Sequence, residues 1–295
     1  MAMTKAQLIQ AVRRLTRLTG SVPYSDDTIA DFLNETIQEV SIIAPFDIYT
    51  EELDTTTATI YTVSENMNDF FGLFYYPLAG DKLEIAIDDN DNVVPLVDAS
   101  AFPSSGYVVL GRMNDWEIVS YTRKGNAGQG EDPNSLYGVT RGIYGKPKLW
   151  VANTPVHIWQ SGSWWTRLEI IPAGSMYDIG VPDDNTKPSR AIRQGKTIIL
   201  NRNPVRGYAN LLVYGFTTPP ALVNSYDTIR GLENREMIVV YLTAIKVLAS
   251  LGGEEALVRV QAYMPLFQLE LERLRQQIDM QIRGMTGQTT INFRE

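Results

Sequence analysis

The sequence predicts an α+β protein in which helices from both chain ends form a helical bundle, with a large inserted antiparallel β domain. Three observations support this prediction: two helix-periodic segments in residues 1–45, two more in residues 221–283, and a period-two pattern over most of residues 46–220. We therefore expect a helical domain made of 1–45 plus 221–283, a β sandwich or barrel made of 46–220, and an extended tail over 284–295.

The first 45 residues contain two amphipathic helices. Thr4 is placed to cap the first helix, and Ser25 or Asp26 the second, because their side-chain oxygens accept hydrogen bonds from the free amides of a first turn. Pro45 ends the second helix, since the residue before a proline resists helical geometry. The second helix carries a continuous apolar stripe made of Ile29, Phe32, Leu33, Ile37, Val40 and Ile43.

The last long segment, residues 232–283, contains two more helices separated by Gly252 and Gly253. The first is apolar around most of its circumference, as expected for a helix buried on several sides. Pro265 either kinks the second helix or starts its regular part. A buried helix needs partners, and the chain offers other helices only at its opposite end. We therefore expect the four helices to pack together.

A period-two pattern connects the two helical pairs. Residues 83–87 and 93–97 read as the arms of a hairpin around the acidic turn 88–92. Asp88, Asn90 and Asn92 imitate the first three ligands of a calcium loop, but Val93 stands where that loop needs glycine. The segment is therefore interpreted as a turn.

The composition is that of an ordinary globular protein. Apolar residues make up 44% of the 295 residues, and the formal net charge is −8. An acidic chain is poorly suited to read DNA, because phosphate contacts need a concentrated basic face. It does suit a surface past which DNA must slide without sticking.

Targeting and redox signals point to a soluble protein folded in a cytoplasm. The chain has no cysteine, which excludes disulfides and thiol chemistry. The first residues lack the apolar run of a signal peptide, and no stretch of about 20 uncharged apolar residues could span a membrane.

The residue inventory gives no catalytic signature, so we expect no enzyme activity, no cofactor and no metal. His157 is the only histidine, and no Gly-x-Ser-x-Gly nucleophile elbow accompanies it. A strand histidine is the simpler interpretation. The acidic residues show no spacing that singles out a catalytic pair, and no glycine-rich phosphate loop is present.

Several aromatic residues could form the floor of a carbohydrate-binding site, although such residues more often fill a β core or a protein interface. They are Tyr75, Tyr76, Trp150, Trp159, Trp164 and Trp165.

One group of motifs resembles a β module that recurs in virion proteins of tailed phages. Glu117 to Thr122 matches its E-x-V-x-Y-T strand, Val139 to Gly142 its V-x-R-G strand end, and His157 its later histidine. Lys146-Pro147 stands where Gly-Thr is usual after the arginine.

A second stretch resembles the end of phage head-to-tail adaptor (connector) proteins, in which a β-hairpin with a proline turn precedes a buried helix. Here the hairpin is formed by residues 198–204 and 208–214, followed by Thr218-Pro219-Pro220 and the helix of 236–251.

The resemblance implies a structural virion protein that forms the adaptor ring between portal and tail. It implies a cyclic, dodecameric assembly in the neck of the virion, assembled in the host cytoplasm. DNA passes non-specifically through the lumen, and no membrane is involved. The implied partners are the portal protein, tail or nozzle proteins, and further copies of this chain. The alternatives are another neck or tail component, such as a tail terminator or a baseplate or fibre-joining protein, and a polysaccharide-binding tail protein.

The tail offers the candidate partner-binding residues. Residues 284–295 are small and polar except for Met285, Ile291 and Phe293. We expect this segment to order on the portal by adding main-chain hydrogen bonds to a sheet edge or groove and inserting its apolar side chains. A frayed terminus is the alternative.

Overall fold

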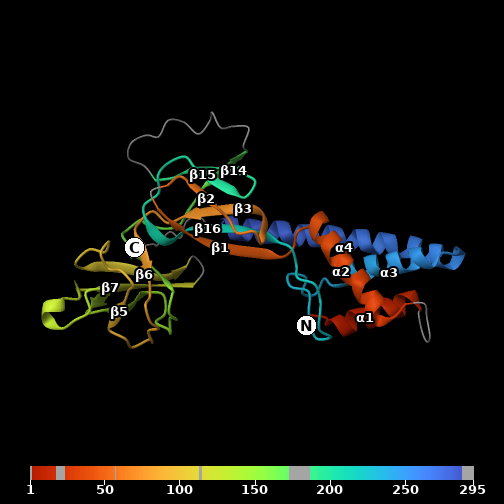
Figure 1. The fold of residues 1–295 in the computed structure, drawn as a ribbon, viewed down its shortest axis with the longest axis horizontal. Helices are drawn as coiled ribbons and strands as arrows, with labels where there is room; N and C mark the ends of the chain where they lie inside the picture. The colour runs from red at the N-terminus through yellow and green to blue at the C-terminus, as the bar shows by residue number, and fades with distance from the viewer. Residues whose placement is uncertain (1, 18–23, 57, 113–114, 173–186, 288–295) are drawn as a thin grey trace. The chain divides into compact units, whose positions relative to one another are not determined.

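A computed structural model describes residues 2–17, 24–56, 58–112, 115–172 and 187–287. Within them the protein is mixed α+β, with four α-helices and several antiparallel sheets (Figure 1). In this part of the chain no helix is both long and apolar enough to cross a membrane. The helices are α1 (Lys5–Thr16), α2 (Asp26–Ile43), α3 (Met237–Leu251) and α4 (Glu254–Gly287), with a short 3₁₀ helix η1 (Ala127–Gln129).

The helix starts follow the predicted caps. Thr4 is the N-cap of α1 and forms a capping box with Gln7, in which each residue's side chain bonds the other's backbone amide. Ser25 caps α2 by accepting a hydrogen bond from the Thr28 amide at 3.1 Å. The C-cap of α1 is Arg17, which adopts a left-handed conformation with φ of 53°, so α1 ends at Thr16.

The strands occupy the predicted period-two region. They are β1 (Ile48–Thr55), β2 (Ile60–Thr62), β3 (Met67–Tyr75), β4 (Gly80–Lys82), β5 (Val93–Pro95), β6 (Gly106–Arg112), β7 (Asp115–Tyr121), β8 (Arg123–Lys124), β9 (Ser135–Tyr137), β10 (Thr140–Tyr144), β11 (Pro155–Trp159), β12 (Thr166–Arg167), β13 (Glu169–Pro172), β14 (Arg190–Gln194), β15 (Thr197–Leu200) and β16 (Gly207–Thr217).

The strands form four sheets within the described residues. Their orders are β1-β16-β3-β12, β10-β7-β6-β11-β4, β13-β14-β15-β2 and β5-β9-β8. Most pairs are antiparallel, but β13 and β14 are parallel, in contrast to the uniformly antiparallel domain that was predicted. The predicted hairpin of residues 83–87 and 93–97 survives only as a single bridge between Leu83 and Leu96, because β5 pairs with β9 and Ile87 lies opposite Trp150. The predicted hairpin of residues 198–204 and 208–214 does not form, because β15 pairs with β14 and β2, whereas β16 lies between β1 and β3 in another sheet.

The chain divides into two compact units. The helical unit comprises Met1–Tyr49, Asn66–Asp69 and Gly215–Gly287, and the β unit comprises, among the described residues, Thr50–Glu65 and Phe70–Tyr214. These borders differ by a few residues from the expected 45/46 and 220/221. The start of β1, the start of β3 and the end of β16 belong to the helical unit.

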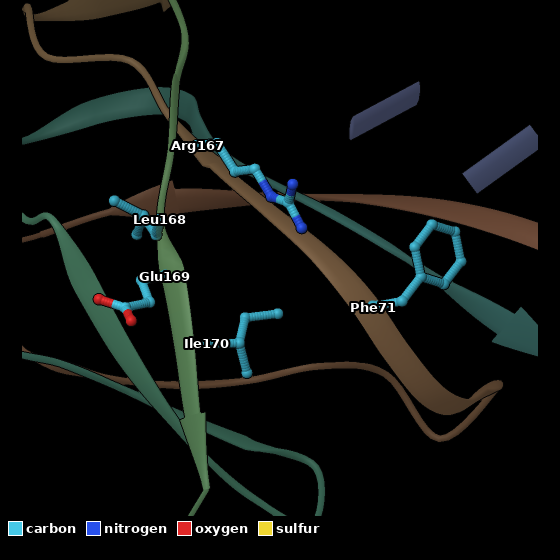
Figure 2. A pocket seen from close by; sticks show the side chains of 5 residues that line it. All are labelled: Phe71, Arg167, Leu168, Glu169 and Ile170. Atoms are coloured by element: carbon cyan, nitrogen blue, oxygen red, sulfur yellow. The ribbon is translucent and has the colours of Figure 1, made fainter. Parts of the chain in front are cut away.

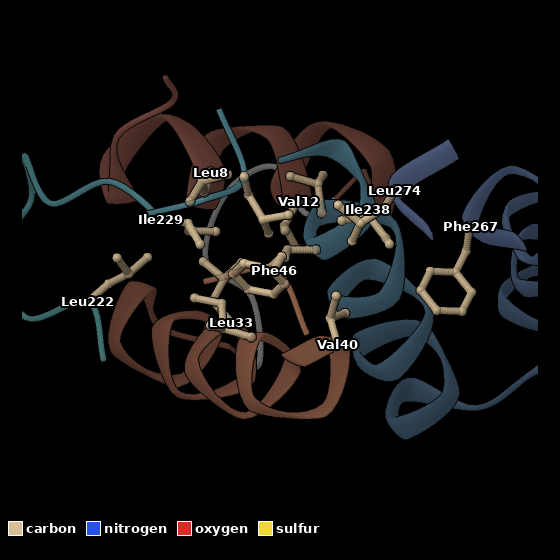
Figure 3. Packing of buried hydrophobic residues seen from close by; sticks show 14 of the residues in the cluster. Leu8, Val12, Leu33, Val40, Phe46, Leu222, Ile229, Ile238, Phe267 and Leu274 are labelled. Carbon is tan, nitrogen blue, oxygen red and sulfur yellow. The ribbon is translucent and has the colours of Figure 1, made fainter. Parts of the chain in front are cut away.

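One hydrophobic cluster in the helical unit draws side chains from both ends of the chain. Figure 3 shows Leu8 of α1, Leu33 of α2 and Ile238 of α3 around Phe46, and all four side chains are at most 2% exposed. α3 packs against each of the other three helices, which explains why it is apolar around most of its circumference. Phe32, a member of the predicted stripe, packs against the cluster but is only partly buried.

α4 differs from the prediction at two points. It is continuous from Glu254 to Gly287, so Pro265 lies inside the helix and does not start it. The helix also passes Gly284, so the predicted tail of 284–295 is helical up to Gly287. Phe267, Leu274 and Ile278 pack in the cluster, and this packing outweighs the helix-breaking tendency of proline and glycine, which amounts to about 3 and 1 kcal/mol.

The β unit has its own hydrophobic cluster. It includes alternate residues of β6, β7 and β11, as expected where one face of a sheet is buried. Its members include Val108, Leu110, Val119, Tyr121, Val156, Ile158, Leu83, Leu96, Leu136 and Trp150.

Candidate functional site

A buried ion pair joins Glu117 and Arg141 in the β unit. Their side chains are 0% and 6% exposed, and Arg141 Nη2 lies 2.7 Å from Glu117 Oε2. Arg141 Nε donates to the other carboxylate oxygen at 2.8 Å. The pair is therefore bidentate, the arrangement that a planar guanidinium and a carboxylate favour.

The strand pattern explains why Glu117 is buried. Glu117, Val119 and Tyr121 alternate along β7, and the latter two belong to the core cluster. A carboxylate on the core face is costly unless charges and hydrogen bonds compensate it. β10 pairs with β7 through Thr140 and Ser120 with an irregular register, which brings Arg141 to Glu117.

Every acceptor position of the carboxylate is used. Oε1 also accepts the Gly142 amide at 2.8 Å, and Oε2 accepts the Trp150 indole N–H at 2.9 Å. Burial alone would raise the pKa of Glu117, but the hydrogen bonds from Arg141, Trp150 and Gly142 outweigh it and hold the pKa below its usual value.

The guanidinium has further partners, since Arg141 also donates to the carbonyl oxygens of Asp88 and Lys148. The Glu117–Arg141 pair therefore links β7 and β10 to the acidic turn and to the segment before Trp150. A carboxylate with no free acceptor and no access to solvent cannot serve as a base, so its role is to fix the loops.

His157, the only histidine, lies in a closed aromatic chamber of the β unit. It is 0% exposed, with ring centroids 4.5 Å from Tyr76 and 5.7 Å from Trp165. Nε2 lies 3.0 Å from the Tyr208 carbonyl, and because a carbonyl only accepts, Nε2 carries the proton. Burial lowers the pKa of His157 to about 4, against the opposing effects of Tyr208 and Asn210. The ring is neutral and inaccessible to a substrate.

Most of the aromatic residues considered for a sugar-binding site are buried in the core. Tyr75, Tyr76, Trp150 and Trp165 are between 0% and 6% exposed. Trp159 is partly buried and contacts the rings of Tyr107 and Tyr144, which are 43% and 46% exposed.

Described residues of the β unit line two open cavities. One, of about 560 Å³, is lined by Arg112, Lys148 and Tyr208 among others. Both cations are already engaged, Arg112 by Glu52 and Lys148 by Asp115. Lys148 Nζ also lies 4.1 Å from the centre of the Trp150 ring, a cation–π contact.

The other cavity, of about 470 Å³, is lined by Phe71, Arg167, Leu168, Glu169 and Ile170 (Figure 2). Figure 2 shows the Glu169 carboxylate pointing away from the Arg167 guanidinium, and Glu169 instead pairs with Arg190 at 2.9 Å. Among the described residues that line these two cavities, no nucleophile is hydrogen-bonded to a base that is in turn oriented by a third group.

Of the predicted partner-binding residues, Met285 alone lies in the described part of the chain. Met285 lies within α4, whereas Ile291 and Phe293 lie outside the described residues. The calcium-like loop is a turn held by its own side chains, since Asp88 accepts the Asn90 amide at 2.8 Å and Asp91 accepts the Asp88 amide at 2.7 Å. Among the described residues, no group of three or more metal-binding side chains is present.

Comparison with known proteins adds no relative: no family model and no curated protein matches the chain.

Sequence reasoning identified the E-x-V-x-Y-T and V-x-R-G segments but missed the contact between them. A glutamate inside the apolar run of β7 was the available signal, because such a residue must either face solvent or find a cation.

Gly80 was also missed. A Cβ on Gly80 would lie 2.3 Å from Cδ2 of His157, so the chamber requires glycine there.

Proposed function

We propose that this chain is a structural protein of a tailed-phage virion, an adaptor that forms a ring between the portal and the tail. The observation that carries the proposal is the Glu117–Arg141 pair. These two residues come from the two strand motifs that resemble the phage virion module, and their buried contact gives both motifs a structural role.

The helical unit supports the same proposal. Side chains from α1 and α2 share one cluster with those of α3 and α4, although the two pairs come from opposite chain ends. In the proposed adaptor these helices act as one bundle, and the inserted β domain is a sandwich or barrel. A bundle and a β domain give the protein two rigid parts, one available to the portal and one to the tail.

The charge and the buried histidine favour a scaffold over an enzyme. A net charge of −8 suits the wall of a channel through which DNA slides. His157 is enclosed by Tyr76 and Trp165, so the residue most suited to acid–base chemistry is used as a core residue.

Electron microscopy of the purified protein, alone and with isolated portal rings, tests the proposal. With portal rings present, the expected result is a closed ring that stacks coaxially on the portal. Absence of a ring both with and without the portal, or a ring with no affinity for the portal, contradicts the proposal.

The expected docking segment is tested on the same particles. Ile291→Ser with Phe293→Ser should weaken attachment to portal-bearing heads without changing the melting temperature, because an extended segment binds through its alternate apolar side chains. Asn292→Ser is the matched control. If the double variant attaches as well as the control, the segment does not dock on the portal.

A further inference from the structure

The first half of α4 is apolar on two opposite faces. One face packs in the helical cluster through Val260, Tyr263 and Phe267. The other is the outer stripe, which follows helical spacing and consists of Val258, Ala262, Pro265, Leu266 and Leu269.

The outer stripe is uncovered in the single chain. Val258 is 65%, Leu266 40% and Leu269 48% exposed, and Ala262 and Pro265 are exposed as well. A helix at the surface of a folded domain normally presents charged or polar residues on its outer face. A helix that is apolar on both faces is usually buried on both, so the outer stripe needs a cover.

Charges of opposite sign stand at the two ends of the stripe. Glu255 precedes it and is 80% exposed, and Arg273 follows it and is 49% exposed. They are 18 residues apart in the sequence, about five helical turns at 3.6 residues per turn, so they lie on the same flank of α4. When two such helices run antiparallel, like flanks meet, and the acidic end of one helix lies beside the basic end of the other.

We propose that a second copy of this chain covers the outer stripe, with the two α4 helices antiparallel about a two-fold axis near Pro265. Val258 then packs against Leu269 of the partner subunit, and Glu255 lies beside Arg273 of the partner subunit. Both contacts occur twice, because in an isologous interface residue i meets j and j meets i.

The internal partners of the two charged residues do not prevent this arrangement. Glu255 pairs with Arg259 and Arg273 with Glu270, one helical turn away in each case. Glu255 and Arg273 are the exposed members of these pairs, and their partners keep other contacts, Arg259 with the Thr16 carbonyl and Glu270 with Arg235. Each exposed side chain can therefore turn to the partner subunit at small cost.

The size of the contact sets the expected affinity. From Glu255 to Arg273 the helix is about 27 Å long, and it is about 10 Å wide. Such a strip is smaller than the roughly 800 Å² per partner of a standard interface. Interfaces below the standard size are typical of weak or transient association, so we expect a reversible dimer.

The dimer is independent of the proposed ring. Ring closure takes a heterologous contact between two different surfaces, whereas this contact joins one surface to itself. Attachment to the portal and self-association in solution are thus separate measurements, and either inference can fail while the other stands.

Sedimentation equilibrium of the full chain over a concentration series tests the proposal. The wild type should be a reversible dimer, and Val258→Glu should weaken it at least tenfold. Ile85→Glu is the matched control, since Ile85 is 60% exposed in the β unit and should leave dimerisation unchanged. Circular dichroism checks that each variant is folded.

Charge exchange and cross-linking test the orientation. Glu255→Arg should weaken the dimer, and Arg273→Glu in the same chain should restore it. Because the chain has no cysteine, single cysteines report the contact under mild oxidation. Val258→Cys and Leu269→Cys should each fail to cross-link alone but should cross-link when mixed.

Three results overturn the proposal. They are a wild type that stays monomeric at its highest soluble concentration, a dimer that Val258→Glu leaves intact, and efficient cross-linking of Val258→Cys with itself, which indicates parallel helices.

Discussion

Arg141→Met is the perturbation that tests the Glu117–Arg141 pair most directly. Methionine keeps much of the apolar length of the side chain but removes the guanidinium. The Glu117 carboxylate then stays 0% exposed with only the Trp150 and Gly142 N–H groups to stabilise its charge. Breaking a buried ion pair from one side costs about 3–5 kcal/mol, because an uncompensated charge remains.

A second variant distinguishes the loss of the Glu117–Arg141 contact from the cost of leaving the Glu117 carboxylate buried without a cation. Glu117→Gln in the Arg141→Met background replaces the carboxylate by a neutral amide that still accepts a hydrogen bond from Trp150. We expect the double variant to be more stable than Arg141→Met alone, with a coupling of at least about 2 kcal/mol between the two sites.

Tryptophan fluorescence during urea unfolding is the appropriate assay. All five tryptophans of the chain lie in the β unit, at positions 116, 150, 159, 164 and 165. Their signal therefore reports this unit, while circular dichroism at 222 nm reports mainly the helices. With a slope of about 2 kcal/mol per molar urea, the expected shift of the fluorescence midpoint for Arg141→Met is about 1.5–2.5 M.

Arg190→Gln provides the control. Arg190 pairs with Glu169 at 2.9 Å in the same unit, but the two side chains are 46% and 65% exposed. An exposed pair contributes less than about 1 kcal/mol. The reasoning is refuted if Arg141→Met destabilises the β unit no more than Arg190→Gln, or if the two changes in the double variant are additive.

Further predictions concern the histidine chamber and the helical unit. The folded pKa of His157 is about 4 and its ordinary value is 6.5, so the stability that neutral His157 contributes is fully present above pH 6.5 and is lost as pH falls toward 4. The loss is about 3 kcal/mol, and His157→Gln should flatten the fluorescence-detected stability over this pH window relative to wild type. Gly80→Ala should destabilise the β unit by about 1–3 kcal/mol in urea titrations, since the added methyl group meets the His157 ring. Gly284→Ala should raise the helical melting temperature, corresponding to about 0.5–1 kcal/mol, because it lies in α4 and nothing stands within 4 Å of the added methyl group. Leu33→Ala should cost about 2–5 kcal/mol by dichroism at 222 nm, because Leu33 is 0% exposed in the helical cluster.

The helices were predictable because their signals are local. Thr4 and Ser25 cap α1 and α2 as their side-chain chemistry indicates. The end of α4 was not predictable in this way. Gly284 argues locally for a stop, but the packing of Ile278 and Ile282 against the helical cluster supports the helix beyond the point where propensity alone would end it.

The polar core of the β unit depends on contacts between distant residues, which a single sequence does not reveal. Glu117 and Arg141 are 24 positions apart, and His157 and Tyr208 are 51 apart. The residue types could be noted in advance, but strand register determines which of them meet. The predicted hairpin at residues 83–97 was wrong in detail for the same reason, since β5 pairs with β9.

Joining the chain ends in one cluster has a consequence for synthesis on the ribosome. Glu39 of α2 accepts a hydrogen bond from Lys246 of α3, which is 207 positions later in the chain. At 5–20 residues per second, roughly 10–40 s pass between the translation of these two residues. During that interval the apolar faces of α1 and α2 have no native partner and are exposed to aggregation. Nascent-chain stability should therefore depend on holding chaperones until α3 emerges, and slow translation of the β unit should lower the yield of folded protein.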